Sequence, residues 1–172
     1  MTTYNVNALD GQIVSFDPDV DILSISTPAN AITATEVDGD LQISTSLATL
    51  TLLSTTLSEL TPTNTTFTDG TRWAVGDLTT DDTLDGGDNT IDFTTDVSLV
   101  DAWQRNNQAN GLEGNDTITL TAGHGNNQLF GGAGTDTISA GNGDNTIFGG
   151  TGETDASDGA DSIIDGSGSN SI

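Results

Sequence analysis

Along the first 80 residues, apolar residues alternate with polar ones over short stretches. A period of two predicts β-strands, because successive side chains of a strand point to opposite faces of its sheet. The sequence Asp38-Gly39-Asp40 predicts a hairpin turn between two of these strands. The predicted strands lie at 20–25, 32–37, 41–45, 47–53 and 72–75. We therefore expect an irregular β-region here rather than a helical one.

Beyond residue 110, single apolar residues recur among glycine, asparagine and aspartate at intervals close to nine. A fixed period of this kind is typical of repeat architectures. The units are 111–119, 122–130, 131–139, 140–148, 149–164 with an insertion of seven residues after Gly152, and 165–172. Their inward apolar positions are Ile118, Leu129, Ile138, Ile147, Ile163 and Ile172, with spacings of 11, 9, 9, 16 and 9. Threonine or serine precedes each of these positions, except at Gln128.

The unit GGAGTDTIS, Gly131 to Ser139, matches the pattern G-G-x-G-x-D-x-U-x at every position. Through this unit and its in-phase neighbours, the chain resembles the RTX family of calcium-binding nonapeptide repeats. Other units depart: Leu112 replaces the second glycine, Ala122 and Ala140 replace the first, and asparagine replaces the sixth-position aspartate in three units. The resemblance implies an all-β fold with a C-terminal parallel β-roll (β-solenoid), preceded by an irregular β-region that is its candidate cap.

On this basis the chain divides into an N-terminal β-region, 1–80, and an RTX-like β-roll, 81–172. The repeats are clear over 111–172 and weaker over 81–110. In a roll of the RTX kind, two successive units complete one coil, so every second unit lies on the same side. One side then carries Asp116, Asp136 and Asp161 at the sixth position, and the other carries Asn127, Asn145 and Asn170.

The very acidic segment 76–101 has two interpretations, a solvated linker or a further part of the roll. The pentapeptide GDNTI occurs at 87–91 and again at 143–147, which favours the roll. Stepping by nine places Val100 and Ala109 at the apolar position, and Ser98 and Asn107 at the sixth. Under this extension Asn89 and Asn107 both fall on the asparagine side.

The two sides should differ in chemistry, because stacked coils about 4.8 Å apart superimpose each sixth residue on the next. Two carboxylates about 5 Å apart repel by roughly 3 kcal/mol at an effective dielectric constant of about 20. The aspartate column therefore needs a cation, and calcium prefers about six to eight carboxylate and carbonyl oxygens. The candidate ligands are the carboxylates of Asp116, Asp136 and Asp161 and the turn carbonyls of Gly111, Glu113, Asn115, Gly131, Ala133 and Thr135.

Stacked asparagines can instead form a neutral ladder of amide-to-carbonyl hydrogen bonds that needs no ion. Asparagine oxygens also ligate calcium, so this side could hold a weaker site. The residues that keep this possibility open are Asp144, Asp88, Asn127 and Asn145. A simpler interpretation, that aspartate and asparagine are both good turn residues, explains the composition but not the strict alternation.

The charge of the chain supports calcium as its first partner. Twenty-six acidic residues face two arginines and no lysine, giving a formal net charge of −24, which repels nucleic acid and anionic membranes. The absence of cysteine excludes disulfides and thiolate metal sites. No apolar run is long enough to insert into a membrane, and the first residues lack a conventional secretory signal. The resemblance implies type I export, hence an extracellular or cell-surface location without a cleaved N-terminal signal peptide.

The remaining motifs do not indicate a second metal site or a catalytic site. The segment DPDVD, Asp17 to Asp21, begins like an EF-hand loop, but Ile22 stands where that loop needs glycine, so we expect an exposed strand edge. His124 has no second histidine or cysteine with which to bind zinc. The sequence holds no nucleophile elbow, Walker loop or Ser-His-Asp arrangement, and we expect no enzyme.

These observations favour a secreted calcium-binding structural protein, the β-roll scaffold of an extracellular surface layer, matrix or fibre. Its open solenoid ends offer unpaired strand edges, through which copies could polymerise head to tail. One alternative is a calcium-dependent folding and secretion module of a larger exoenzyme, toxin or adhesin. Another is a binding module that uses Trp73 and Trp103 to contact a glycan or a protein partner.

Overall fold

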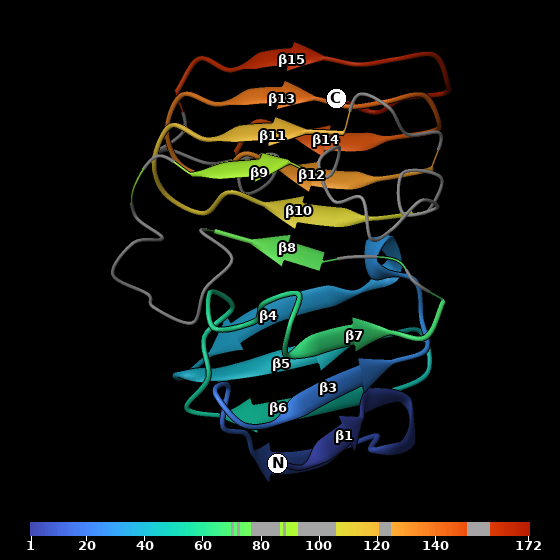
Figure 1. Ribbon diagram of the computed structural model, residues 1–172, viewed down its shortest axis with the longest axis vertical. Coiled ribbons are helices and arrows are strands. Elements are labelled where there is room, and N and C mark those ends of the chain that lie inside the picture. Colours follow the sequence, from blue (N-terminus) through green and yellow to red (C-terminus); the bar gives the residue numbers. More distant parts are fainter. Residues whose placement is uncertain are drawn as a thin grey trace.

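The computed structural model describes residues 1–69, 71, 73–76, 87, 89–92, 106–120, 125–150 and 159–172. This part of the chain is built from β-strands, with two single-turn 3₁₀ helices, η1 (Val6–Ala8) and η2 (Ala29–Ala31). The strands stack along the long axis of the molecule, with the N-terminal region at one end and the coils of a parallel roll above it (Figure 1). The expected all-β fold, a β-roll preceded by an irregular β-region, is therefore confirmed.

Two sheets and one apolar core make up the N-terminal region. Strands β1 (Thr3–Asn5), β3 (Ile22–Ile25) and β7 (Thr65–Phe67) form a parallel sheet in the order β1-β3-β7. The second sheet has the order β2-β6-β5-β4, with strands β2 (Gln12–Ser15), β6 (Thr49–Leu53), β5 (Asp40–Ser44) and β4 (Thr33–Val37). The predicted alternation holds, since two alternate apolar residues in each of β3, β5 and β6 are fully buried: Leu23, Ile25, Leu41, Ile43, Leu50 and Leu52.

The predicted hairpin joins β4 to β5, whose antiparallel register pairs Val37 with Asp40. The two turn residues between them, Asp38 and Gly39, have φ angles of 55° and 85°. Such a two-residue turn needs positive φ at both positions, which aspartate and glycine tolerate. The turn sequence therefore fixes the register of these two strands.

The roll consists of two parallel four-stranded sheets that face each other. One has the order β15-β13-β11-β9, with strands β9 (Thr90–Asp92), β11 (Thr117–Thr119), β13 (Thr137–Ser139) and β15 (Ser162–Ile164). The other has the order β14-β12-β10-β8, with strands β8 (Trp73–Val75), β10 (Gln108–Asn110), β12 (Gln128–Phe130) and β14 (Thr146–Phe148). Successive repeats from residue 108 onward thus alternate between the sheets, as predicted.

The central residue of each strand triplet points into the roll. Ile118, Leu129, Ile138 and Ile147 are at most 1% exposed, and they form the core with Ala74, Ile91 and Ala109. Ile163 is only half-buried and Ile172 is 73% exposed, because the final described coil has a neighbouring coil on one side only.

Strand β8 joins the N-terminal region to the roll. Its Ala74 packs in the roll core, whereas Trp73 and Val75 belong to the N-terminal core, so the strand contributes to both. Leu112, the residue that replaces the second glycine of its repeat, has a φ of 76° and packs against the N-terminal core. The N-terminal region therefore covers the first described coil and caps the roll at this end (Figure 1).

The predicted extension of the repeats toward the N-terminus places the described apolar positions correctly, but it assigns Asn89 to the wrong side of the roll. Ala109 is buried in β10 and Asn107 precedes that strand, as predicted. Asn89, however, precedes β9, which pairs with β11 on the aspartate side. Ile91 and Ala109 lie on opposite sheets, a step that takes nine residues in a regular repeat, but 18 residues separate them here. The nine additional residues keep the apolar position in phase, so the sequence gives no sign that the side has changed. Val100 and Ser98 lie outside the described residues.

The segment from Asp17 to Asp21 is a turn, not the exposed strand edge expected from its alternation. The backbone N–H of Asp21 donates to the carbonyl of Asp17 at 2.7 Å. The Asp21 carboxylate accepts N–H bonds from Thr2 (2.6 Å) and Asp17 (3.2 Å), and the Thr2 bond is the main cause of its lowered pKa. Asp21 thereby ties the start of β1 to this turn.

Candidate metal centre

Both sixth-position columns use the same hydrogen bond to hold successive coils together. On the aspartate side, Asn89, Asp116 and Asp136 each donate their backbone N–H to the Oδ1 atom of the residue one coil later, at 2.7, 2.7 and 2.8 Å. On the asparagine side, Asn107, Asn127 and Asn145 do the same at 3.0 Å in each case. One side-chain oxygen is therefore committed to the preceding turn whether the residue is aspartate or asparagine.

The second side-chain atom distinguishes the columns. Asp116 and Asp136 are 1% exposed, and their Oδ2 atoms lie against the first-position glycines of their own repeats, Gly111 and Gly131. A Cβ atom at Gly131 would overlap both Asp136 Oδ2 and the carbonyl oxygen of Gly149. Carboxylate and carbonyl oxygens thus converge at a position that only glycine leaves open. Buried carboxylates are costly without a compensating cation or donor.

Asparagine places a hydrogen-bond donor at the equivalent position. The Nδ2 groups of Asn127, Asn145 and Asn170 donate to turn carbonyls of their own units, those of Gly125 (2.8 Å), Gly141 (2.9 Å) and Gly166 (3.2 Å). Asn127 Nδ2 also donates to Asn145 Oδ1 at 3.1 Å, the amide-to-carbonyl bond expected of a neutral ladder. The amide hydrogens therefore occupy carbonyl oxygens that a cation would otherwise bind.

The first repeat position alternates together with the sixth. Every unit with a sixth-position aspartate begins with glycine: Gly111, Gly131 and Gly149. The units with a sixth-position asparagine at 107, 127, 145 and 170 begin instead with Ala102, Ala122, Ala140 and Asp165. Glycine is kept where its missing Cβ makes room for Oδ2, and a side chain is tolerated where the amide closes the turn. The two positions together define the candidate cation site.

The residues predicted as ligands occupy successive turns of the aspartate side. Gly111, Glu113 and Asn115 lie in the turn before β11, and Gly131, Ala133 and Thr135 lie one coil later, with a bridge between Glu113 and Ala133. The Ala133 carbonyl accepts the N–H of Gly114 at 2.9 Å, which uses one of its two lone pairs. Asp161 continues the column in the last coil and is half-buried.

The other candidate ligands are placed differently. Asp144 is exposed, and its Oδ1 accepts the N–H of Ser169 at 2.7 Å. Both are the fifth residues of their units, so Asp144 links its turn to the turn one coil later. Asp88 lies outside the described residues. Asn127 and Asn145 are buried in the asparagine ladder.

Two residues at this centre escaped the sequence prediction. Asp161 Oδ2 lies against Gly149, as Asp136 Oδ2 lies against Gly131. Gly149 is the first position of the unit that contains Asp161, so the repeat pattern could have identified this glycine. Asp165 accepts the Asn145 Nδ2 at 2.9 Å and adds one carboxylate to the asparagine side in the last coil. No pattern position predicted an acidic residue there.

The donor set fits a hard cation. Nowhere in the described part of the chain do three or more His, Cys, Asp or Glu side chains gather into a metal cluster. A cation in the aspartate column would instead take carboxylates from successive coils and complete its shell with turn carbonyls. Calcium accepts such flexible all-oxygen coordination, whereas zinc favours nitrogen and sulfur ligands.

Parallel coils, glycine turns and a buried aspartate column define a class of protein, the calcium-binding β-rolls. A family model agrees: the RTX calcium-binding nonapeptide repeat, in four copies, matches residues 104–124 and 121–153. Residues 104–153 of the roll thus match RTX repeats, whose cofactor is calcium. Searches of curated proteins and of solved structures returned no match. Within the described residues, no helix is long and apolar enough to cross a membrane.

Proposed function

We propose that this protein is a secreted structural protein whose roll folds around calcium and serves as a scaffold in an extracellular surface layer, matrix or fibre. The observation that carries the proposal is the column of Asp116, Asp136 and Asp161 facing first-position glycines, in which Asp116 and Asp136 are buried. This column is the part of the roll that calcium completes. The proposal assigns the protein no catalytic role.

The proposed route out of the cell follows from the same column. Proteins with RTX repeats are typically exported by type I secretion, and a chain of net charge −24 resists compaction until cations neutralise it. Where calcium is scarce the aspartate side cannot close, and the chain stays suitable for export. Where calcium is plentiful, binding to the folded state alone stabilises it by about 2.7 kcal/mol at a concentration 100 times the dissociation constant.

Calcium titration of the full chain tests this function. We expect circular dichroism to show a gain of β-structure and calorimetry to show saturable heat, both reversed by chelation. Magnesium is the matched control, because it demands octahedral geometry and retains its waters, so it should not replace calcium. A roll that is fully formed in chelator and takes up no heat from calcium would refute the proposal.

A further inference from the structure

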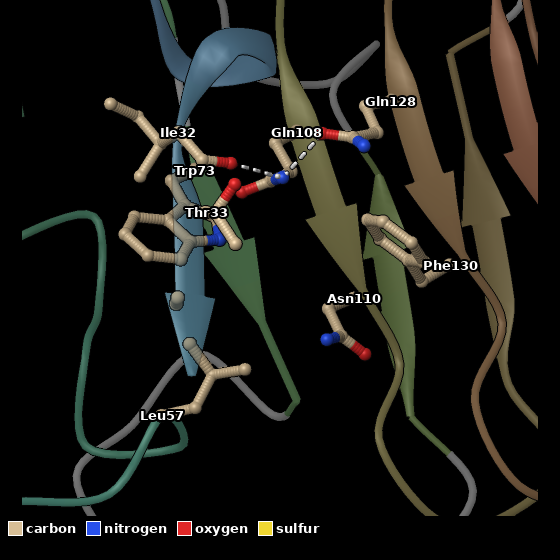
Figure 2. Close-up of a pocket in the computed structure, with 9 residues that line it drawn as sticks. Ile32, Thr33, Leu57, Trp73, Gln108, Asn110, Gln128 and Phe130 are labelled. Atoms are coloured by element: carbon tan, nitrogen blue, oxygen red, sulfur yellow. Dashed lines mark hydrogen bonds between the residues drawn. The ribbon is translucent and has the colours of Figure 1, made fainter. Parts of the chain in front are cut away.

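A cavity of about 150 Å³ lies where the cap meets the outer face of the roll (Figure 2). The cap contributes β4 and Leu57, and the roll contributes outward side chains of β8, β10 and β12. Its lining residues are Ile32, Thr33, Ala34, Leu57, Trp73, Gln108, Asn110, Gln128 and Phe130. The cavity is separate from the aspartate column, which belongs to the opposite sheet.

The outward seventh position explains why this cavity is polar. Trp73, Gln108 and Gln128 are paired in register on β8, β10 and β12, where other repeats carry threonine or serine. Gln108 is 6% exposed, and its Nε2 donates to Gln128 Oε1 at 2.7 Å and to the Ile32 carbonyl at 3.3 Å. These bonds orient the Gln128 amide so that its nitrogen points toward the Phe130 ring (Figure 2). The unusual glutamines therefore form a fixed pair.

Trp73 supplies a further donor. The residue is 3% exposed, and its indole nitrogen lies on the side of the ring that faces β10 (Figure 2). Within the described residues this N–H has no hydrogen-bond acceptor, although it borders the cavity. The indole N–H is therefore available as a donor to a molecule in the cavity.

The outward ninth position supplies an aromatic face. Phe130 stacks on Phe148 with ring centroids 5.3 Å apart and an interplanar angle of 11°. In the sheet, Phe130 is paired with Phe148 on one side and Asn110 on the other. One face of the Phe130 ring is therefore covered by Phe148, and the other turns toward Asn110 and the cavity. Asn110 Oδ1 accepts the N–H of Leu112 at 3.1 Å, which leaves its amide nitrogen as a donor.

We propose that this cavity binds one neutral sugar residue. A sugar ring has an apolar C–H face suited to an aromatic ring, while its hydroxyl groups need hydrogen-bond partners such as amides and the indole N–H. None of the described residues that line the cavity is charged, and the net charge of −24 repels anions. Its volume of about 150 Å³ is below that of typical pockets for drug-sized ligands, which suits a single ring.

The test is a nuclear magnetic resonance titration of the full, calcium-loaded chain carrying Trp103→Phe, so that the remaining indole N–H signal is that of Trp73. The probes are the methyl glycosides of glucose, galactose and N-acetylglucosamine, with methyl glucuronide and uridine for comparison. We expect saturable shifts of the Trp73 indole and Gln128 amide signals with at least one neutral glycoside, and weaker binding of the anionic glucuronide.

Two variants identify the site. Gln128→Thr introduces the residue usual at this repeat position, so the roll should still fold, while loss of the amide should weaken sugar binding about tenfold. Thr146→Ala, at the same position of the next strand, lies outside the cavity and should leave the affinity unchanged. The proposal is overturned if no neutral glycoside gives saturable shifts, if Gln128→Thr binds as well as the parent, or if only uridine binds. Calcium calorimetry on the same samples reports the metal sites separately.

Discussion

At the sixth position of each repeat, one atom decides what the turn can hold. Asp136 and Asn145 both use Oδ1 to accept an N–H from the preceding coil. Asparagine then adds a donor that binds the Gly141 carbonyl, while aspartate adds a second negatively charged oxygen beside Gly131. Asparagine therefore closes its turn with hydrogen bonds alone, whereas we expect the aspartate side to need a cation to balance its buried negative charge.

Substitutions in the two columns should have different effects. We expect Asp136→Asn to lower calcium affinity by at least about tenfold, because it removes a charged ligand from the middle of the column. Gly131→Ala should do the same, since its Cβ would overlap Asp136 Oδ2. Asn145→Ala should leave calcium affinity nearly unchanged but lower the free energy of unfolding by about 1 to 3 kcal/mol, through unsatisfied backbone groups.

Calorimetry measures the affinities and denaturant unfolding measures the stabilities of these variants. If Asp136→Asn and Asn145→Ala weakened calcium binding equally, the two sides would not differ as described.

At the scale of elements, the cap and the roll are held together by different forces. The cap has one apolar core that includes leucines and isoleucines from both of its sheets, on β3 and on β5 and β6. The roll core has one inward apolar residue per strand triplet and relies on hydrogen bonds between turns. Because apolar burial is the larger source of stability, the cap should hold its structure without calcium and the roll should not.

Chelation should therefore separate the two regions. In hydrogen exchange, we expect amides of β10 to β15 to lose protection when calcium is removed, while those of β3, β5 and β6 stay protected. Loss of protection to the same extent in both regions would show that they fold as one calcium-dependent unit.

The features that depend on a regular spacing of residues could be predicted from the sequence. The hairpin at Asp38-Gly39, the inward isoleucines and the two alternating sides are all present in the structure. Three strands, β1, β2 and β7, were not predicted, because each is short and its place depends on contacts with distant strands. The side of Asn89 was wrong because nine additional residues leave the phase unchanged.

The site was only partly predictable. The aspartate column was visible as a pattern, but the role of first-position glycine emerged only when Asp136 Oδ2 was seen against Gly131. The pairing of Gln108 with Gln128 depends on the register between coils, which a single repeat does not specify.

At the scale of the whole molecule, the two ends of the roll are unlike. The cap covers the β8 end. At the other end, Ser171 forms a bridge to Thr146 of β14, whereas β15 is the outermost described strand of its sheet. Near that edge, Ile164 is 62% exposed and Ile172 is 73% exposed. An unpaired edge with apolar neighbours is a natural surface for association, and contact with the unlike end of a second copy would not close on itself.

We expect the chain to form filaments in calcium and to disperse on chelation, as seen by electron microscopy and sedimentation. Ile164→Lys should reduce the association without altering calcium affinity, because it places a charge on the edge. Thr137→Lys, at an exposed outward position of β13 away from both ends of the roll, is the control and should assemble normally. Monomers in both conditions would instead favour a module that works within a larger protein.

The asparagine ladder has one more consequence. Because its amides satisfy the turns without an ion, the spacing between coils is fixed along one wall by the chain itself. Calcium then closes the opposite wall at a pitch that is already set. Loss of calcium should therefore separate the turns on the aspartate side while those on the asparagine side stay hydrogen-bonded. The roll would then open along one side over its whole length, instead of losing its coils one after another.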